Sequence, residues 1–283
     1  MTHESDRPFA RVAILGLGVM GGSLARALAA LRNRPGVTGW SPIPEERRAA
    51  LASGAVDAAP AEWQDAVREA DLVVLAAPLG VSCELLPRVA AVVGPDTVLS
   101  DVASLKAPMA RAALAAGLEG RWVGTHPMAG SEASGFRAAR ADLYRDARVW
   151  LVAAPQGAAQ VPRVQAFWAE LAARPAEIDA EEHDRLMALA SHLPQLSSNA
   201  LASVLMEAGL RPQQLGPGGW DTTRLAGSNA DLWKDLLGYA SPDLARGLRD
   251  LAATADRIAD LLERRDIEAI ADIMRSTRVW RES

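Results

Sequence analysis

The chain has 283 residues, 49% of them hydrophobic and 23% charged, which suits a globular protein of one large or two smaller domains. Its formal net charge of −5 and its lack of a Lys/Arg cluster argue against nucleic acid as a partner, because phosphate binding needs a concentrated basic face. No apolar run reaches membrane-spanning length, the start carries no signal-peptide pattern, and the single cysteine, Cys83, excludes intrachain disulfides and Cys-based zinc sites. We therefore expect a cytoplasmic protein with no membrane partner and no metal site.

The first half of the chain alternates strand and helix patterns. Residues 11–15 (RVAIL) form a short buried-strand pattern, which runs into the glycine-rich segment GLGVMGGS and an Ala- and Leu-rich helix over 24–31. Further strands are expected at 37–40, 71–77, 97–100, 121–124 and 148–153, and helices at 45–52 and 106–116. Because the strands are nearly all apolar, they predict a parallel sheet covered by helices on both faces. The expected fold class is an α/β Rossmann-type, doubly wound parallel sheet.

The second half of the chain has a different character. From about Val161 onward, Ala, Leu, Glu and Arg recur with helical spacing. Helical segments are expected at 161–173, 180–209, 220–239 and 242–280, with one short strand near 176–178. The Pro-Gln-Gly sequence at 155–157 marks a hinge. The sequence thus predicts a dinucleotide-binding Rossmann domain over 9–155 and an all-helical domain over 156–283.

The glycine-rich segment follows a strand and opens a helix, which is the setting in which this pattern binds a dinucleotide. Gly16 permits the tight turn, Gly18 lets the backbone approach a pyrophosphate, and Gly21 allows close helix–strand packing. The helix N-terminus adds unpaired N–H groups and a partial positive charge. We therefore expect a nicotinamide cofactor, and we assign Pro78, at the end of the strand DLVVLAA, to the same site. The alternative is a glycine-rich turn without a ligand.

The choice between NAD and NADP rests on the end of the second strand. An NAD site usually places Asp or Glu there, against the ribose 2′-hydroxyl, but this chain has Ser41. A serine does not repel a 2′-phosphate and can donate a hydrogen bond to it. Arg47 and Arg48 follow shortly after, either as phosphate ligands or simply as solvated side chains. The sequence favours NADP on these grounds and leaves NAD open.

His126 opens the segment HPMAGSE and is one of only four histidines in the chain. The proline after it disfavours helix, and a Gly-Ser-Glu turn follows. This predicts a rigid loop that presents an imidazole beside a carboxylate, a pair able to move a proton near neutral pH. The alternative is a histidine that caps a tight turn.

Two further segments carry candidate site residues. DVASLK lies at the end of a predicted strand, the sheet edge that faces the ligand crevice in a doubly wound fold. Its Ser104 can hydrogen-bond His126 and fix the tautomer, or it can serve as a helix N-cap. SHLPQ places His192 before a proline inside a helical pattern, which can turn the imidazole into a cleft or merely kink the helix.

Taken together, the motifs GLGVMGGS, DVASLK, GTHPMAGSEASG, EEHDRLMALASHLPQ and DTTRLAGSNADLW run in order from Arg11 to about Tyr239. In this order they resemble the prephenate/arogenate dehydrogenase family of tyrosine biosynthesis. The resemblance implies oxidative decarboxylation with reduction of NAD or NADP, in a homodimer formed by the helical domain. It also implies that His126 is the general base, that Ser104 orients it and that His192 contacts the substrate. His183 also fits the family pattern, and we assign it a structural role.

The resemblance extends to the substrate side. It implies that Arg224 binds a substrate carboxylate, a role that suits a guanidinium facing a dianion, and that Trp233 shapes the active site. Glu132 is similar to an acid that gates the pocket or pairs with the arginine, and we place Ser131 and Gln195 beside the substrate. Without the resemblance, Arg224 would be read as a surface salt bridge and Trp233 as core packing.

The chain departs from the family pattern in two places. Gln195 stands where many relatives carry a second histidine, and Lys234 follows the tryptophan where arginine is common. Because Gln195 is neutral, it offers no negative charge to the ammonium of arogenate, so the sequence favours prephenate as the substrate.

Two other functions remain open from the sequence. A β-hydroxyacid dehydrogenase shares the opening GLGVMG but needs a catalytic lysine in its helical domain, and the only lysines here are Lys106 and Lys234. A cofactor-sensing protein without catalysis would have no use for His126, His192 and Arg224.

Overall fold

The computed structural model describes residues 7–130 and 133–283, which form two compact units. The first unit comprises the chain up to Asp184 together with Ser228–Ala240. The second comprises Arg185–Gly227 and Ser241–Ser283. This division differs from the boundary expected between residues 155 and 156, because the central sheet continues beyond that point.

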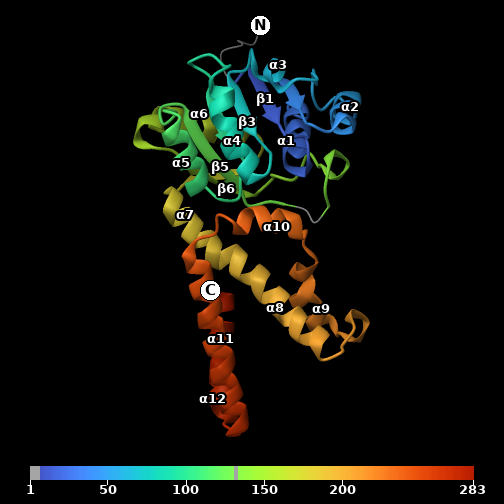
Figure 1. Ribbon diagram of the computed structural model, residues 1–283, viewed down its shortest axis with the longest axis vertical. Helices are drawn as coiled ribbons and strands as arrows, with labels where there is room; N and C mark the ends of the chain where they lie inside the picture. The colour runs from blue at the N-terminus through green and yellow to red at the C-terminus, as the bar shows by residue number, and fades with distance from the viewer. Residues whose placement is uncertain (1–6, 131–132) are drawn as a thin grey trace. The chain divides into compact units, whose positions relative to one another are not determined.

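The first unit is built on a seven-stranded sheet (Figure 1). Its strands are β1 (Arg11–Leu15), β2 (Gly36–Trp40), β3 (Leu72–Leu75), β4 (Val98–Asp101), β5 (Trp122–Pro127), β6 (Arg148–Val152) and β7 (Arg174–Glu177). They lie in the order β2-β1-β3-β4-β5-β6-β7. The first five are mutually parallel, which confirms the predicted doubly wound sheet.

The last two strands depart from the expected all-parallel arrangement. β6 runs antiparallel to β5, and β7 runs parallel to β6. A parallel connection needs a crossover element, usually a helix. Between β5 and β6 the only helical element in the described residues is the short η2 (Phe136–Ala138), and the chain returns alongside β5 in the opposite direction.

Helices cover both faces of this sheet. They are α1 (Val19–Ala29), α2 (Pro44–Ala52), α3 (Trp63–Val67), α4 (Leu79–Ala90), α5 (Ala107–Ala115), the short η3 (Pro155–Gln160) and α6 (Val161–Glu170). The same unit includes α10 (Ala230–Leu237), which contacts α4. Alternate side chains of β1 point to opposite faces, as the period of a strand requires. Val12 and Ile14 join a buried cluster with α1 and α6, whereas Ala13 and Leu15 join a second cluster with α3, α4 and α5.

The second unit is helical, as predicted. After α7 (Ala180–Met187), whose last residues open this unit, come the π-helix η4 (Ala188–His192), α8 (Leu193–Glu207), η5 (Pro212–Gln214), α9 (Pro217–Thr223), η6 (Arg224–Gly227), α11 (Pro242–Glu263) and α12 (Ile267–Glu282). The segment expected to be helical over 242–280 is interrupted at 264–266. Arg265 adopts a φ of 57°, and the Asp266 side chain accepts a hydrogen bond from the Ala269 amide to cap α12.

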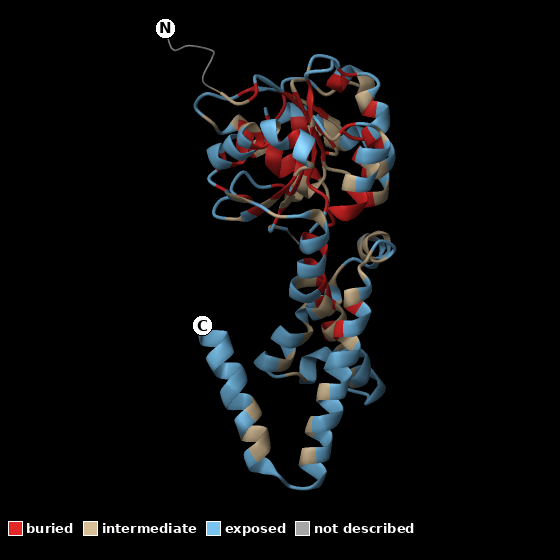
Figure 2. Cartoon of the chain, turned by 90° about the vertical axis from the view of Figure 1, so that its left-hand side faces the viewer, coloured by how far each residue is buried: buried red, intermediate tan, exposed pale blue. Residues whose placement is uncertain are grey.

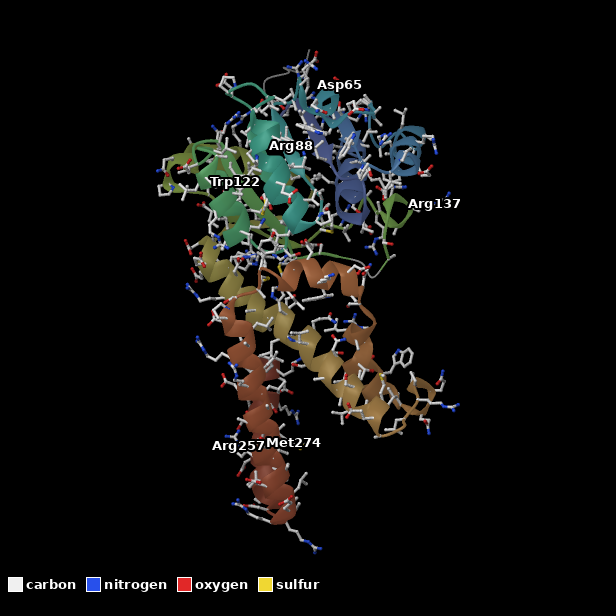
Figure 3. The ribbon with its side chains drawn as sticks, viewed as in Figure 1. Asp65, Arg88, Trp122, Arg137, Arg257 and Met274 are labelled. Carbon is white, nitrogen blue, oxygen red and sulfur yellow. The ribbon has the colours of Figure 1, made fainter. Side chains whose placement is uncertain are left out.

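Packing within the second unit is close at one end and open at the other. A Cβ added to Gly247 of α11 would lie 3.0 Å from Leu189 and 3.2 Å from Leu193, so the absence of a side chain lets α11 approach η4 and α8. By contrast, α12 buries none of its side chains, and Figure 2 shows it in the colours of exposed and half-buried residues. Met274, labelled in Figure 3, is 67% exposed and Trp280 is 76% exposed. None of the helices in the described ranges is long and apolar enough to span a bilayer.

Candidate active site

The glycine-rich loop between β1 and α1 has the geometry of a phosphate-binding turn. Gly16 has a φ of 111°, and a Cβ there would lie 2.3 Å from the carbonyl oxygen of Ala76. A Cβ on Gly21 would lie 1.8 Å from the carbonyl oxygen of Gly16, whereas a Cβ on Gly18 would meet nothing within 4 Å. Among the described residues no side chain caps the start of α1, so the first amides of this helix can bind an anion. The geometry thus agrees with the sequence analysis: Gly16 forms the turn, Gly18 leaves open space for a ligand, and Gly21 packs tightly against the turn.

This loop opens onto a pocket of about 660 Å³. The pocket is lined by Gly16, Leu17, Gly18, Trp40, Ser41, Pro42, Ile43, Glu46, Trp63, Ala76, Ala77, Pro78, Val81, Glu84, Leu85 and Arg88. These residues follow or flank the carboxyl ends of β1, β2 and β3, and β1 lies between the other two in the sheet. A doubly wound sheet binds its ligand at this switch point in strand order. The residues present therefore fit a dinucleotide, and Pro78 is among the lining residues.

The end of β2 carries a hydrogen-bonded pair that the sequence did not reveal. Ser41 is buried, and its hydroxyl donates to Glu46 Oε2 at 2.5 Å. The guanidinium of Arg47 donates to the Ser41 carbonyl oxygen. Arg48 forms an exposed ion pair with Glu45 at 2.5 Å. A carboxylate therefore stands beside Ser41, and both arginines have partners within the chain.

His126 lies near the end of β5, where it contacts a second histidine. Its Nδ1 is 2.8 Å from Nε2 of His183, and the two rings meet edge to face with their centroids 5.0 Å apart. Nδ1 of His183, in turn, is 2.7 Å from Oδ1 of Asp184. His183 is fully buried within α7. The three side chains thus form a chain of hydrogen bonds that ends on a carboxylate.

The carboxylate fixes which nitrogen of each ring carries a proton. An ionised Asp184 can only accept, so Nδ1 of His183 must be the donor in that bond. In neutral His183 the remaining nitrogen, Nε2, is then an acceptor, and Nδ1 of His126 must donate to it. Neutral His126 consequently has its lone pair on Nε2, the nitrogen directed away from His183. That tautomer is the one a general base requires.

Asp184 is itself held in place by the DVASLK segment. Its Oδ1 accepts from the Lys106 amide at 2.7 Å and its Oδ2 from the Ala107 amide at 3.0 Å, both at the N-terminus of α5. These two backbone donors fix the position of the Asp184 carboxylate. The segment after β4 is therefore connected to His126 through Asp184 and His183.

The two charged residues of DVASLK form a fully buried ion pair. The Lys106 ammonium donates to Asp101 and to the Thr125 carbonyl oxygen, 2.7 Å away for the latter. Trp122, labelled on β5 in Figure 3, donates its indole N–H to Asp101 at 3.2 Å. Burial raises the pKa of the Asp101 carboxyl even beside this ammonium. The pair joins β4 to the residue preceding His126, and it leaves Lys106 unsuited to act as the catalytic lysine of a β-hydroxyacid dehydrogenase.

Ser104 does not take the position expected of it. Its side chain is exposed, and the structure describes no hydrogen bond between Ser104 and His126. His183 occupies Nδ1 of His126 instead, so the residue given a structural role by sequence orients the imidazole. The sequence signal was the His183-Asp184 pair itself, which could be recognised as a donor and acceptor but not connected to His126.

The residues expected to bind substrate are divided between the two units. In the second unit, His192 is buried at the end of η4. Gln195 donates to Asn199 Oδ1 at 2.9 Å and to the Leu225 carbonyl oxygen at 2.6 Å. Gln195 thereby connects α8 to η6, the turn that begins with the exposed Arg224.

Trp233 belongs to the first unit, on α10, where it is half-buried. The same helix contacts the start of α4, where Asp235 accepts a hydrogen bond from the Gly80 amide at 3.3 Å. Ser131 and Glu132 lie outside the described residues, so their assignments rest on the resemblance alone.

Comparison with known proteins agrees with this architecture. Residues 24–177 match the family model described as prephenate dehydrogenase, nucleotide-binding domain, and residues 179–276 match prephenate dehydrogenase, dimerization domain. The chain is 31% identical to the cyclohexadienyl dehydrogenase of Zymomonas mobilis over 267 residues, covering 91% of this chain and 90% of that protein.

Two solved structures share the fold at lower sequence identity. Prephenate dehydrogenase from A. aeolicus in complex with hydroxyphenyl propionate and NAD⁺ gives a TM-score of 0.88 at 24% identity over 96% of both chains. Synechocystis arogenate dehydrogenase gives 0.82 at 24% identity, covering 96% of this chain and 99% of that one.

A dinucleotide-binding Rossmann unit joined to a helical unit defines a class of nicotinamide-dependent oxidoreductases. Within that class, the family models that together match most of this chain are decisive. The chain belongs to the prephenate dehydrogenase family.

Proposed function

We propose that the protein catalyses the oxidative decarboxylation of prephenate to 4-hydroxyphenylpyruvate with reduction of NAD or NADP, as a step of tyrosine biosynthesis. The observation that carries the proposal is the His126–His183–Asp184 chain at the carboxyl end of β5. It lies in the same unit, and at the same edge of the sheet, as the dinucleotide pocket. A base of fixed tautomer near such a pocket is what oxidation of an alcohol requires.

His126 acts as the base in this reaction. Its Nε2 takes the proton from the ring hydroxyl of the substrate. A nicotinamide held in the pocket would supply the acceptor for the hydride that leaves the carbon bearing this hydroxyl. The imidazolium that forms keeps Nδ1–H directed at His183, whose Nε2 accepts it in a charge-assisted hydrogen bond. As carbon dioxide leaves and the ring becomes aromatic, the same imidazolium can return the proton to the phenolic oxygen. The reaction then balances without a further acid or base.

Arg224 supplies the charge for substrate binding in this proposal. A guanidinium can bind a carboxylate through two parallel hydrogen bonds, and prephenate carries two carboxylates. The two bonds donated by Gln195 hold α8 against η6, so Gln195 acts by positioning the turn that begins at Arg224. His192, Trp233, Ser131 and Glu132 remain proposed substrate contacts, as the family resemblance implies.

Prephenate is the proposed substrate in preference to arogenate. Arogenate has an ammonium where prephenate has a keto group, and an ammonium is bound best beside a carboxylate. Gln195 is neutral, and both of its amide hydrogens have acceptors within the second unit. The ratio of kcat/KM for the two compounds tests this preference, and a ratio that favours arogenate by about tenfold, or about 1.4 kcal/mol, would reverse it.

The proposed assembly is a homodimer formed through the helical unit. A monomer would expose the large apolar side chains of α12, among them Met274, Val279 and Trp280. The dimerization-domain model covers most of this unit. A partner surface would bury large apolar side chains that are exposed in this number along one helix. The cytoplasmic location stays a prediction.

The proposal is tested by assaying the purified protein with prephenate and with arogenate, each in the presence of NAD⁺ or NADP⁺. Replacement of His126 by alanine should lower kcat about 10²–10⁴-fold, the range typical of a lost general base, while the Kd of the cofactor stays close to that of the wild type. Near-normal turnover by the His126→Ala protein would eliminate His126 as the base.

A further inference from the structure

The carboxylate nearest the end of β2 in the dinucleotide pocket belongs to Glu46, a residue of the following helix. A dinucleotide site that selects NAD places Asp or Glu directly after this strand, where it binds the ribose 2′-hydroxyl. Here Ser41 holds that position, with its hydroxyl committed to Glu46 at 2.5 Å. Both residues line the pocket, and Glu46, on the first turn of α2, is half-buried. The negative charge missing from the strand end is therefore supplied from the following helix.

The two arginines that follow Glu46 have hydrogen-bond partners within the chain. The Arg47 guanidinium donates to the carbonyl oxygen of Ser41, and neither Arg47 nor Arg48 is among the lining residues. Arg48 pairs instead with Glu45, and both side chains are 71% exposed. Arg47 and Arg48 are thus each hydrogen-bonded to another residue of this chain.

The remaining ionisable groups of the pocket leave it negative. Besides Glu46, the ionisable lining residues in the described part of the chain are Glu84 and Arg88, both on α4. Arg88, labelled in Figure 3, stacks over the Trp63 ring with its guanidinium carbon 5.6 Å from the ring centroid. Two carboxylates and one guanidinium line a pocket whose ligand, in NADP, would bring a further phosphate.

We infer that Glu46, held in place by Ser41, selects NAD⁺ over NADP⁺ by accepting a hydrogen bond from the adenosine ribose and by repelling a 2′-phosphate. This inference rests on the proposed function for the identity of the cofactor class, and it reverses the preference for NADP drawn from Ser41 in the sequence. Ser41 is a positioning residue in this arrangement. The carboxylate that it orients makes the contact.

The experiment measures cofactor binding without substrate, by isothermal titration calorimetry with NAD⁺ and NADP⁺. Wild-type protein should bind NAD⁺ at least about tenfold more tightly, since a hydrogen bond to a charged group accounts for about that factor. Glu46→Gln should weaken NAD⁺ binding and strengthen NADP⁺ binding, which brings the two Kd values together. Glu45→Gln is the matched control, because it removes the adjacent acid of the same helix and should leave the wild-type ratio unchanged. Ser41→Ala should move the ratio in the same direction as Glu46→Gln.

The inference is overturned if wild-type protein binds NADP⁺ as tightly as NAD⁺, or if Glu46→Gln keeps the wild-type ratio. Circular dichroism of each variant shows whether it is folded, so that a lost binding signal is not mistaken for lost selectivity. Turnover separates this result from the proposed function. Selective NAD⁺ binding without oxidation of prephenate or arogenate would refute the proposed function and support the inference. Oxidation of either compound by a protein that binds NAD⁺ and NADP⁺ equally would support the function and refute the inference.

Discussion

The hydrogen bond between His126 and His183 leads to a prediction that a pair of substitutions can test. Asparagine at position 183 keeps an amide nitrogen the same number of bonds from Cα as Nδ1, so it can still donate to Asp184. It has no atom that reaches His126. Glutamine has a carbonyl oxygen the same number of bonds from Cα as Nε2, so it can still accept from Nδ1 of His126. His183→Asn therefore removes the hydrogen bond to His126, and His183→Gln removes the hydrogen bond to Asp184.

The size of the effect follows from the 2.8 Å bond. When His126 takes the substrate proton, this bond becomes charge-assisted, and such bonds contribute about 1.5–3 kcal/mol. Losing that amount in the transition state lowers kcat roughly 10- to 150-fold. His183→Asn should show this loss with little change in KM, because the bond strengthens only as the proton is transferred. His183→Gln should recover part of the rate.

The assay is steady-state formation of the reduced nicotinamide across a range of pH. In His183→Asn, the acid limb of the kcat profile should move to lower pH, because the variant no longer stabilises the protonated imidazole. A purely structural role for His183 would predict equal losses for both variants and an unmoved profile. Wild-type kcat in His183→Asn would refute the orienting role.

Two further predictions concern the framework and the assembly. Lys106→Met should lower the free energy of unfolding by about 3–5 kcal/mol, because it leaves Asp101 buried without its counter-charge. Since the pKa of Asp101 is already raised by burial, the folded variant holds a proton that the unfolded chain releases, so the loss should grow as pH rises above the ordinary range of aspartate. Urea unfolding at several pH values measures both, and unchanged stability would contradict the buried pair. Sedimentation equilibrium should give a dimer at micromolar concentration and a monomer for Val279→Glu; a wild-type monomer would exclude the proposed assembly.

Local backbone requirements made the cofactor loop predictable from sequence. Gly16 and Gly21 are required by their immediate surroundings. Gly16 has a positive φ, and a side chain on Gly21 would collide with the carbonyl oxygen of Gly16. By contrast, the residue pattern of a strand does not indicate whether it pairs parallel or antiparallel with its neighbour. The reversal of β6 depends on whether the preceding connection holds a crossover helix, which the residue pattern of the strand itself does not encode.

The contacts of the candidate site were less predictable because they join distant or offset residues. His126 stood out as one of four histidines, but its partner lies 57 residues further along the chain. Glu46 was missed for a different reason. The sequence rule seeks an acid at the end of β2, and here the acid reaches that place from five residues beyond, through a hydroxyl.

The path of the chain through the two units has a practical consequence. The chain leaves the first unit after Asp184, returns at Ser228 to form α10, and leaves again after Ala240. A fragment ending at Asp184 would contain all seven strands but would lose Asp235 and with it the acceptor for the Gly80 amide at the start of α4. Isolating the nucleotide-binding half therefore calls for grafting residues 228–240 back through a linker. No single truncation can yield it intact.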